Sequence, residues 1–235
     1  MDALNLGDSA AARQVPEFVG FRSFPANENR PGEGRVEVGG SMLFWATKRA
    51  FDIVMALLAL PVVIAVGIAL LMVNPFFNPG PLFYRQQRTG RYGEPFTILK
   101  FRTMVGIKKE GVAFASAEAF RIRKLGAALR RFRIDELPQI VNVLRDEMSF
   151  IGPRPEQCDF VNAFAKTIPG YHQRHAVRPG ISGYAQVVNG YADCEFSTKQ
   201  KLDRDLEYIT GAGWKMEGYV FFRTIFVVFT GFGAL

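Results

Sequence analysis

Two adjacent carboxylates, Asp135 and Glu136, lie within the stretch RRFRIDELPQ, residues 131–140. Neighbouring residues project about 100° apart on a helix, so the two cannot share one face as an acid/base pair at i,i+4 would. They could instead divide the work, one attacking as a nucleophile and the other binding a divalent metal. The simpler interpretation is that Asp135 caps a helix whose first turn contains Pro138.

Basic residues crowd around this pair. The formal net charge is +7, and the window from Arg121 to Arg133 contains six basic residues and no acidic one. Such a patch predicts an anionic partner, whether a phosphate, a nucleic acid or a membrane surface. We expect the nearby arginines and the helix start to lower the pKa of Asp135 and keep it ionised, and to attract phosphate to the same place.

Five further positions could bind an anion or support such a site. Lys100 and Arg102, in LKFRTM, are two apart on a predicted strand and therefore share a face. Arg154 lies between two prolines in GPRPE, which fix the backbone that carries it. Arg178 adjoins a Pro-Gly turn, and Asp205 lies in DRDLEY. Taken singly, each is most simply a solvated surface residue.

The composition of 235 residues, 49% of them hydrophobic, is sufficient for a sizeable core. The two cysteines, Cys158 and Cys194, follow no metal spacing and form no disulfide framework, so a reducing cytoplasm is expected. Residues 1–40 combine glycine, proline and scattered charge without periodicity, and we expect a disordered cytoplasmic tail there.

A long apolar segment must hold the rest against a membrane. From Ala50 to Val73 the only residues outside the apolar set are Asp52, Pro61 and Gly67. About 24 helical residues are long enough to cross a bilayer core. Basic residues flank both ends: Lys48 and Arg49 before it, and Arg85, Arg88 and Arg91 after it. A straight span cannot keep both basic ends in the cytoplasm, whereas a re-entrant helix bent at Pro61 can; the sequence leaves both open.

The elements that would position the candidate residues alternate between short strands and helices. Strands are expected at about 82–86 and 95–101 around the turn TGRYGEP. Helices are expected at 116–131, from near Asp135 to Leu144, at 156–166 and at about 196–210, while VRPGISGYAQV should be turn-rich and then briefly strand-like. The C-terminal GYVFFRTIFVVFTGFGAL places Phe222, Phe226 and Phe229 at helical spacing, as in a core helix or, the interpretation that we favour, an interfacial helix.

The order of these motifs resembles that of the monotopic phosphoglycosyl transferases, the bacterial sugar transferase family. An apolar helix broken by proline is followed by LKFRTM, a basic helix leading into IDELPQ, GPRPE, VRPGISGYAQV and a D-x-x-Y helix. The resemblance covers roughly residues 45–235, and DELPQ with GPRP downstream is its most specific part. It implies an α+β, mostly helical monotopic membrane protein with a re-entrant helix at 41–75, and a catalytic domain at 76–235 with interfacial amphipathic helices and a small β-hairpin.

The resemblance also implies a reaction at the cytoplasmic face of the bacterial inner membrane. These enzymes transfer a sugar-1-phosphate from a UDP-sugar to a polyprenol phosphate with Mg²⁺ as cofactor. Carried over to this chain, Asp135 is the nucleophile that attacks the β-phosphorus and releases UMP, and Glu136 is the Mg²⁺ ligand. Lys100, Arg102, Arg130, Arg154 and Asp205 match the positions of the phosphate and nucleotide site.

The chain departs from the family pattern in three places. Leu60 precedes Pro61 where the family usually has serine, AQVVNGYA carries Tyr191 where arginine is common, and TGAGW stands where the family has NWS. The second departure bears on the nucleotide or sugar contacts of that loop. No motif maps onto a hexose hydroxyl, so the sugar is open, and the sequence does not decide between a monomer and a homo-oligomer.

The alternative is a membrane-anchored basic module that binds anionic lipid or nucleic acid without catalysis. The net charge and the apolar segment fit it. Nucleic acid is not expected as a partner, because residues 121–133 contain only one aromatic residue, Phe132, for base stacking.

Overall fold

The computed structural model describes residues 36–106, 120–189 and 195–230. Its helices and strands are α1 (Met42–Phe77), β1 (Phe83–Thr89), the 3₁₀ helix η1 (Arg91–Gly93), β2 (Pro95–Phe101), α2 (Lys124–Arg131), the 3₁₀ helix η3 (Ile134–Gln139), α3 (Ile140–Leu144), β3 (Ser149–Ile151), α4 (Cys158–Thr167), the 3₁₀ helix η4 (Tyr171–His175), β4 (Gly180–Ser182), α5 (Tyr184–Asn189), α6 (Glu195–Thr210) and α7 (Trp214–Thr230). The expected mostly helical α+β fold with a long apolar helix and a small hairpin is confirmed.

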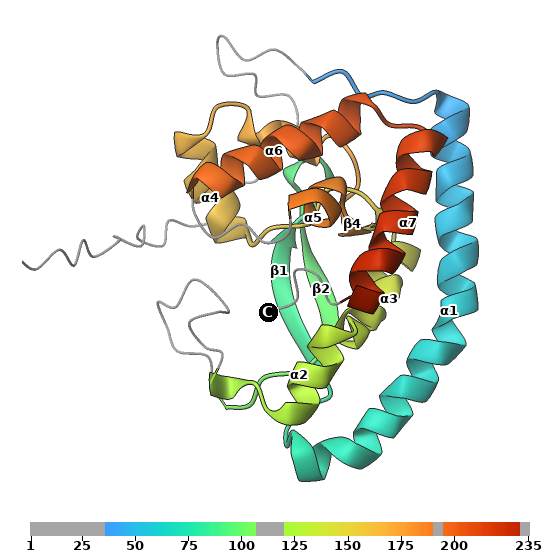
Figure 1. Cartoon of the computed structure of the whole chain (residues 1–235), viewed down its shortest axis with the longest axis vertical. Coiled ribbons are helices and arrows are strands. Elements are labelled where there is room, and N and C mark those ends of the chain that lie inside the picture. The colour runs from blue at the N-terminus through green and yellow to red at the C-terminus, as the bar shows by residue number, and fades with distance from the viewer. Residues whose placement is uncertain (1–35, 107–119, 190–194, 231–235) are drawn as a thin grey trace, which may run out of the picture.

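Helix α1 runs along one edge of the molecule and bends part-way along its length (Figure 1). Ser41 caps its start by accepting a hydrogen bond from the Phe44 N–H, and the helix continues through Pro61 and Pro75. Its buried side chains recur at intervals of three, four or seven residues: Phe44, Lys48, Asp52, Ala56, Val63, Gly67, Leu70 and Asn74. This spacing makes one stripe, which faces the rest of the protein.

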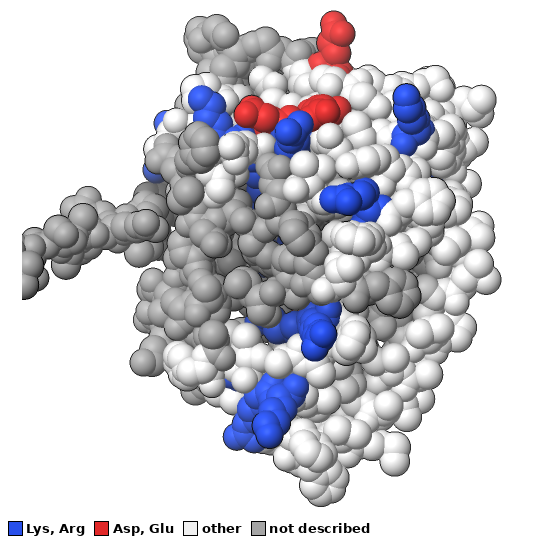
Figure 2. All heavy atoms as spheres, viewed as in Figure 1, with Lys and Arg blue, Asp and Glu red and all other residues white. Residues whose placement is uncertain are grey.

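The remaining surface of α1 is apolar and exposed. Leu58 is 67% exposed and Met72 is 71% exposed. In the described part of the chain α1 is the one helix long and apolar enough to cross a membrane, and only 22% of its most apolar window is buried. Figure 2 shows almost no charged side chains along the edge where Figure 1 places α1. A helix exposed in this way is suited to lipid rather than to the core of a soluble protein. Return of the chain to the same membrane face stays a prediction.

The strands form two small sheets among the described residues. Strands β1 and β2 pair antiparallel, from Phe83 opposite Phe101 to Thr89 opposite Pro95. The first strand therefore extends three residues beyond the expected range, because the Thr89 N–H donates to the Glu156 carbonyl (2.9 Å), a contact from far along the chain. Strands β3 and β4 pair in parallel, a sheet that the sequence did not predict. The brief strand expected within VRPGISGYAQV is β4, and the rest of that segment enters helix α5.

Two expected helices are shorter than predicted. The basic helix begins at Lys124, because the preceding residues pair with the chain after β2: Ile122 bridges Met104, and the Arg121 side chain donates to the Val105 carbonyl. Its part before residue 120 lies outside the described residues. The helix expected from Asp135 to Leu144 is divided into η3 and α3. Pro138 within η3 has no N–H to donate, which favours the tighter 3₁₀ turn over a continuous α-helix.

The core joins α1 to the hairpin and to α3. Apolar residues of the α1 stripe, including Ala56 and Leu70, pack with Ile98 and Phe101 of β2 and with Val143 of α3. A second cluster joins β3 to α5, α6 and α7, and a third joins α4 to η4 and α6. Helix α3 and the hairpin are therefore packed against the apolar helix, and η3 packs on β2.

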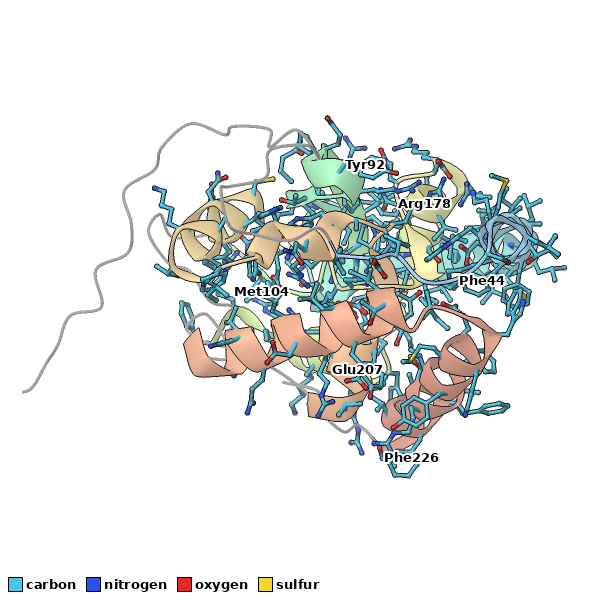
Figure 3. All side chains as sticks on the ribbon, turned by 90° about the horizontal axis from the view of Figure 1, so that it is seen from above. Phe44, Tyr92, Met104, Arg178, Glu207 and Phe226 are labelled. Carbon is cyan, nitrogen blue, oxygen red and sulfur yellow. The ribbon has the colours of Figure 1, made fainter. Side chains whose placement is uncertain are left out.

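Helix α7 presents aromatic side chains outward. Phe222 and Phe226 are 70% and 53% exposed, and Figure 3 shows Phe226 at the outer edge of the molecule. This surface argues against the simple core-helix alternative, while an interfacial location for α7 stays a prediction. The Phe229 side chain lies outside the described residues, as do residues 1–35 of the expected tail and Tyr191 of the altered loop.

Candidate active site

Asp135 and Glu136 are placed by an unusual backbone turn. Arg133, which precedes η3, has a φ of 57°, the left-handed region that non-glycine residues rarely adopt. The Glu136 N–H then donates to the Arg133 carbonyl (3.1 Å), which closes the first turn of η3. Arg133, not Asp135, therefore occupies the cap position, and the N-cap interpretation of Asp135 is wrong. Strain of this kind is often found where a structure holds functional side chains in place.

Glu136 is the centre of a cluster of cations. Its carboxylate is buried, and Oε1 accepts hydrogen bonds from Lys100 Nζ (2.8 Å) and Arg154 Nη2 (2.7 Å). Arg133 Nη1 lies 3.6 Å from Oε2. Burial alone would raise the pKa of Glu136, but Arg154 and Lys100 hold it well below its usual range. Glu136 is therefore ionised and paired.

Asp135 has the opposite environment. Its side chain is half-buried, and within the described ranges the structure shows no hydrogen bond or ion pair to it. Burial raises the pKa of Asp135, and the Glu136 charge raises it further, while Lys100, Arg130 and Arg154 lower it. The expected lowering is thus wrong: the neighbouring cations are drawn to Glu136, so burial decides the direction. A partly desolvated, unpaired carboxylate is a stronger nucleophile when it ionises than one held in a salt bridge.

Lys100 and Arg154 reach this site from separate elements. Lys100 lies on β2, and burial lowers the pKa of its ammonium group, although Glu136 opposes the shift. Arg154 follows β3, and its carbonyl accepts a hydrogen bond from Arg174 Nη2 (2.9 Å). The backbones of the two parallel strands approach so closely here that a Cβ on Gly180 would lie 2.1 Å from the Gly152 nitrogen. Glycine at this position is what allows the GPRP loop to present Arg154.

Two of the predicted substrate ligands lie in other surroundings. Arg102 donates to the carbonyls of Asn78, Pro81 and Met104 and so fastens the end of α1 to the end of the hairpin. Asp205 is 1% exposed and forms a 2.6 Å ion pair with Arg174. Both residues are bound to protein groups in this arrangement, and their assignment to the phosphate and nucleotide site stays a prediction.

Arg130 and Arg178 complete the set of candidates. Arg130, in the last turn of α2, is half-buried and close enough to lower the pKa of Asp135. Figure 2 shows basic side chains over the part of the molecule where Figure 1 places α2. Arg178 instead pairs with Asp146 (2.7 Å) and lines a separate cavity of about 400 Å³ at the tip of the hairpin. The carboxylate pair thus has one further basic residue nearby, and Arg178 is not part of its site.

Comparison with known proteins agrees with this arrangement, because the sequence model of a family described as bacterial sugar transferase matches residues 43–231. The chain belongs to the bacterial sugar transferase family. The resemblance inferred from the motifs is therefore confirmed, and the match includes the apolar helix as well as the site.

Three relatives of this chain are named for a reaction or a process. It is 42% identical over 195 residues to the UDP-N-acetylgalactosamine-undecaprenyl-phosphate N-acetylgalactosaminephosphotransferase of Aeromonas hydrophila, covering 83% of this chain and 46% of that protein. It is 38% identical over 184 residues to the UDP-glucose:undecaprenyl-phosphate glucose-1-phosphate transferase of Escherichia coli K12, covering 76% and 39%. It is 35% identical over 188 residues to the exopolysaccharide production protein PSS of Rhizobium leguminosarum bv. phaseoli, covering 76% and 92%. The chain therefore spans less than half the length of the first two.

Magnesium, which the bacterial sugar transferase family implies, does not fit the carboxylates as they are arranged. Both oxygens of Glu136 face cations, and a divalent ion there would meet Lys100 and Arg154. No group of three or more His, Cys, Asp or Glu side chains suited to a metal occurs among the described residues. Of the two carboxylates, only Asp135 has no cation paired with it among the described residues. One carboxylate is too few ligands for Mg²⁺ held by the protein.

An ionic cluster that the motifs did not predict surrounds Glu156, two residues after Arg154. Glu156, in the same GPRPE motif, pairs with Lys201 of α6 and lies 3.6 Å from Arg174 and 4.0 Å from Arg88. These partners lower the pKa of Glu156 far below its usual range against the effect of burial. The glutamate at the end of the motif was a signal that could have been followed. Its partners lie too far along the chain to be paired with it by spacing.

Proposed function

We propose that the chain transfers a sugar-1-phosphate from a UDP-sugar to a polyprenol phosphate, with Asp135 as the nucleophile. The observation that carries this proposal is the contrast between the two carboxylates: Glu136 is paired with Lys100 and Arg154, and Asp135 beside it has no partner among the described residues. Phosphoryl transfer depends mainly on positioning and on neutralising the charge of the phosphates. An unpaired carboxylate next to a cluster of cations meets both needs.

The reaction divides into two displacements at one phosphorus. An oxygen of Asp135 attacks the β-phosphorus of the UDP-sugar, and the bond to the bridging oxygen breaks, so UMP leaves with that oxygen. The sugar phosphate is then bound to Asp135 as an acyl phosphate. An oxygen of the polyprenol phosphate attacks the same phosphorus, the acyl phosphate bond breaks, and the Asp135 carboxylate is regenerated. Covalent catalysis of this type separates one transfer between two bulky partners into two easier steps.

Basic side chains would bind the phosphates during these steps. Arg130 is half-buried and has no acidic partner in the described part of the chain, so it is available to the diphosphate. Lys100 and Arg154 lie within reach of both Glu136 and the space next to Asp135, because each lowers the pKa of both carboxylates. A bound diphosphate would compete with Glu136 for these two cations.

We further propose that the reaction takes place at the cytoplasmic face of the bacterial inner membrane. The exposed apolar surface of α1 would lie in the bilayer, which brings the hairpin and η3 to the level where a polyprenol phosphate presents its headgroup. The relatives from Aeromonas hydrophila and Escherichia coli are named for transfer to undecaprenyl phosphate, but with different sugars. The donor sugar is therefore best identified by a screen of UDP-sugars.

The experiment is to trap radiolabelled phosphosugar on the purified protein without lipid acceptor and to locate it by peptide mass spectrometry. Label on Asp135, released as lipid-linked sugar on adding polyprenol phosphate, is the expected result. Asp135→Asn should remain folded, since Asp135 makes no described hydrogen bond, but should lose exchange between UMP and UDP-sugar. Label on another residue, or full exchange in Asp135→Asn, would reject the covalent role. A basic binding module would release no UMP with any donor.

A further inference from the structure

Asp52 is a carboxylate within the apolar helix α1. It is 2% exposed and lies on the buried stripe between Lys48 and Ala56. A charged side chain in a lipid-facing helix is costly unless it turns away from the lipid and finds partners, and such residues commonly have a role beyond anchoring. None of the steps proposed above uses Asp52.

Both oxygens of Asp52 bind the start of strand β3. Oδ2 accepts a hydrogen bond from the Ser149 hydroxyl (2.7 Å), and Oδ1 accepts one from the Phe150 N–H (3.2 Å). The Phe150 bond is to the backbone, so it fixes the strand itself and not only a side chain. The apolar helix thus holds β3 through two bonds from one residue.

Strand β3 leads directly to Arg154. After the parallel pairing with β4, the Gly152 N–H donates to the Ser182 carbonyl (2.9 Å), and the Gly180 N–H donates to the Pro153 carbonyl (3.0 Å). Prolines on both sides of Arg154 then restrict the backbone. The segment from Ser149 to Arg154 therefore has little freedom, and a shift at its start would be passed to the guanidinium that contacts Glu136.

The other end of β3 is tied to the same helix. Lys48 Nζ forms a buried 2.6 Å ion pair with Glu217 of α7. The Tyr208 hydroxyl lies 2.6 Å from Glu217 Oε1 and 3.1 Å from the Ile151 carbonyl. Lys48 and Asp52, one helical turn apart on α1, thus support the last and first residues of β3.

We propose that Asp52 is a positioning residue, through which the membrane helix sets the place of Arg154 next to the carboxylate pair. The helix α1 is then part of the scaffold of the site as well as its anchor. The effect on turnover rests on the proposed function. The tie between α1 and residues 149–154, meaning the hydrogen bonds of Asp52 to Ser149 and Phe150, does not rest on it and is tested separately.

The tie is tested by amide hydrogen exchange on the full chain in lipid nanodiscs. Asp52→Ala should speed exchange of the peptide spanning residues 149–154 at least ten-fold, while Phe51→Ala, which truncates an exposed neighbour on the same helix, should change it less than two-fold. Asp52→Asn should resemble the unchanged protein, because its amide can accept from Phe150 N–H and donate to Ser149 Oγ. Equal exchange in Asp52→Ala and Phe51→Ala would overturn the proposal, whether or not the protein releases UMP.

The route through Arg154 is tested by a double-mutant cycle on UMP release. Asp52→Ala should lower turnover at least ten-fold in the unchanged background and less than three-fold when Arg154→Ala is already present. A loss that is equally large in both backgrounds would overturn the proposal, since Asp52 would then act elsewhere. Absence of UMP release by the unchanged protein would instead reject the proposed function. The hydrogen-exchange result would then decide whether Asp52 holds residues 149–154 in place.

Ser149→Ala provides the same test without altering the membrane helix, should Asp52→Ala fail to fold. It removes the hydroxyl that donates to Asp52 Oδ2 and leaves the Phe150 bond in place. Turnover should fall at least three-fold, and this loss should disappear in the Arg154→Ala background. Unchanged turnover in Ser149→Ala, or a loss that persists with Arg154→Ala, would count against the proposal as strongly as the corresponding results for Asp52.

Discussion

Replacing Glu136 with Gln removes a negative charge that faces three cations, Lys100, Arg133 and Arg154. The Glu136 side chain is 7% exposed, and Lys100 and Arg154 contact it at 2.8 and 2.7 Å. Removing one partner from a buried ion pair costs about 3–5 kcal/mol. Lys100 and Arg154 are 15% and 19% exposed, so water can partly compensate them, and we expect the lower end, about 3 kcal/mol of unfolding free energy.

A loss of about 3 kcal/mol corresponds to a fall in Tm of about 6–12 °C for a chain of this size. Thermal unfolding in detergent or nanodiscs measures it. Glu94→Gln, at an exposed position of the same hairpin, is the matched control and should stay within about 0.5 kcal/mol. A change in Glu136→Gln no larger than the control would show that the carboxylate does not compensate the cations.

Turnover of Glu136→Gln should fall at least ten-fold, because Lys100 and Arg154 no longer pair with residue 136 and are drawn toward Asp135, which reduces its nucleophilicity. The Glu136 charge contributes to the raised pKa of Asp135, so its loss should move the acid limb of the pH–rate profile to lower pH. High Mg²⁺ should restore neither Tm nor turnover. Restoration of both by Mg²⁺ would refute this reasoning and establish Glu136 as the metal ligand that the family resemblance implies.

Three further predictions concern other parts of the chain. Arg130→Ala should lower UMP release about ten-fold or more, and Arg123→Ala less than about three-fold, because Arg123 is exposed and Arg130 lies near Asp135. Equal small losses in the two variants would show that the basic residues 121–133 form only a solvated or membrane-facing surface. Burial lowers the pKa of His175 to about 3, so below about pH 6.5 the unfolded chain binds a proton that the folded chain does not. The free energy of unfolding should therefore fall by up to about 1.4 kcal/mol for each unit that the pH is lowered, down to about pH 3. Thermal unfolding of His175→Gln should show a weaker pH dependence. A tag after Val73 should be inaccessible to labelling from the periplasm, and Pro61→Ala should straighten α1 and expose it; periplasmic labelling of the unchanged protein would reject the re-entrant topology.

The elements with strong local signals were predictable from the sequence. The turn chemistry of TGRYGEP fixed the hairpin, and the length of the apolar run fixed α1. Strands β3 and β4 have three residues each and pair across about thirty positions, so neither carries a periodic signal. Pro138 was ambiguous for a different reason: proline is favoured in the first turn of an α-helix and is equally compatible with the 3₁₀ turn that forms.

The site was predictable as a set of residues but not as a set of partners. Asp135, Glu136, Lys100 and Arg154 do come together. Which of the two carboxylates pairs with the cations depends on side-chain orientation, which the sequence does not contain. The prediction that the pKa of Asp135 is lowered was wrong for this reason. Asp205 shows the same difficulty, because its partner Arg174 lies on another element. Spacing brings residues to a site, whereas burial and competition for partners determine what each does there.

Competition for cations also connects the resting site to its proposed reaction. While Lys100 and Arg154 are held by Glu136, Asp135 remains unpaired and its raised pKa reflects burial. A diphosphate placed beside Asp135 carries more negative charge than Glu136 and should draw both cations toward the phosphorus that is attacked. Charge neutralisation would then occur where the reaction needs it and only when the substrate is present. Glu136 would therefore act by pairing with Lys100 and Arg154, and so keeping them from pairing with Asp135, until the substrate binds.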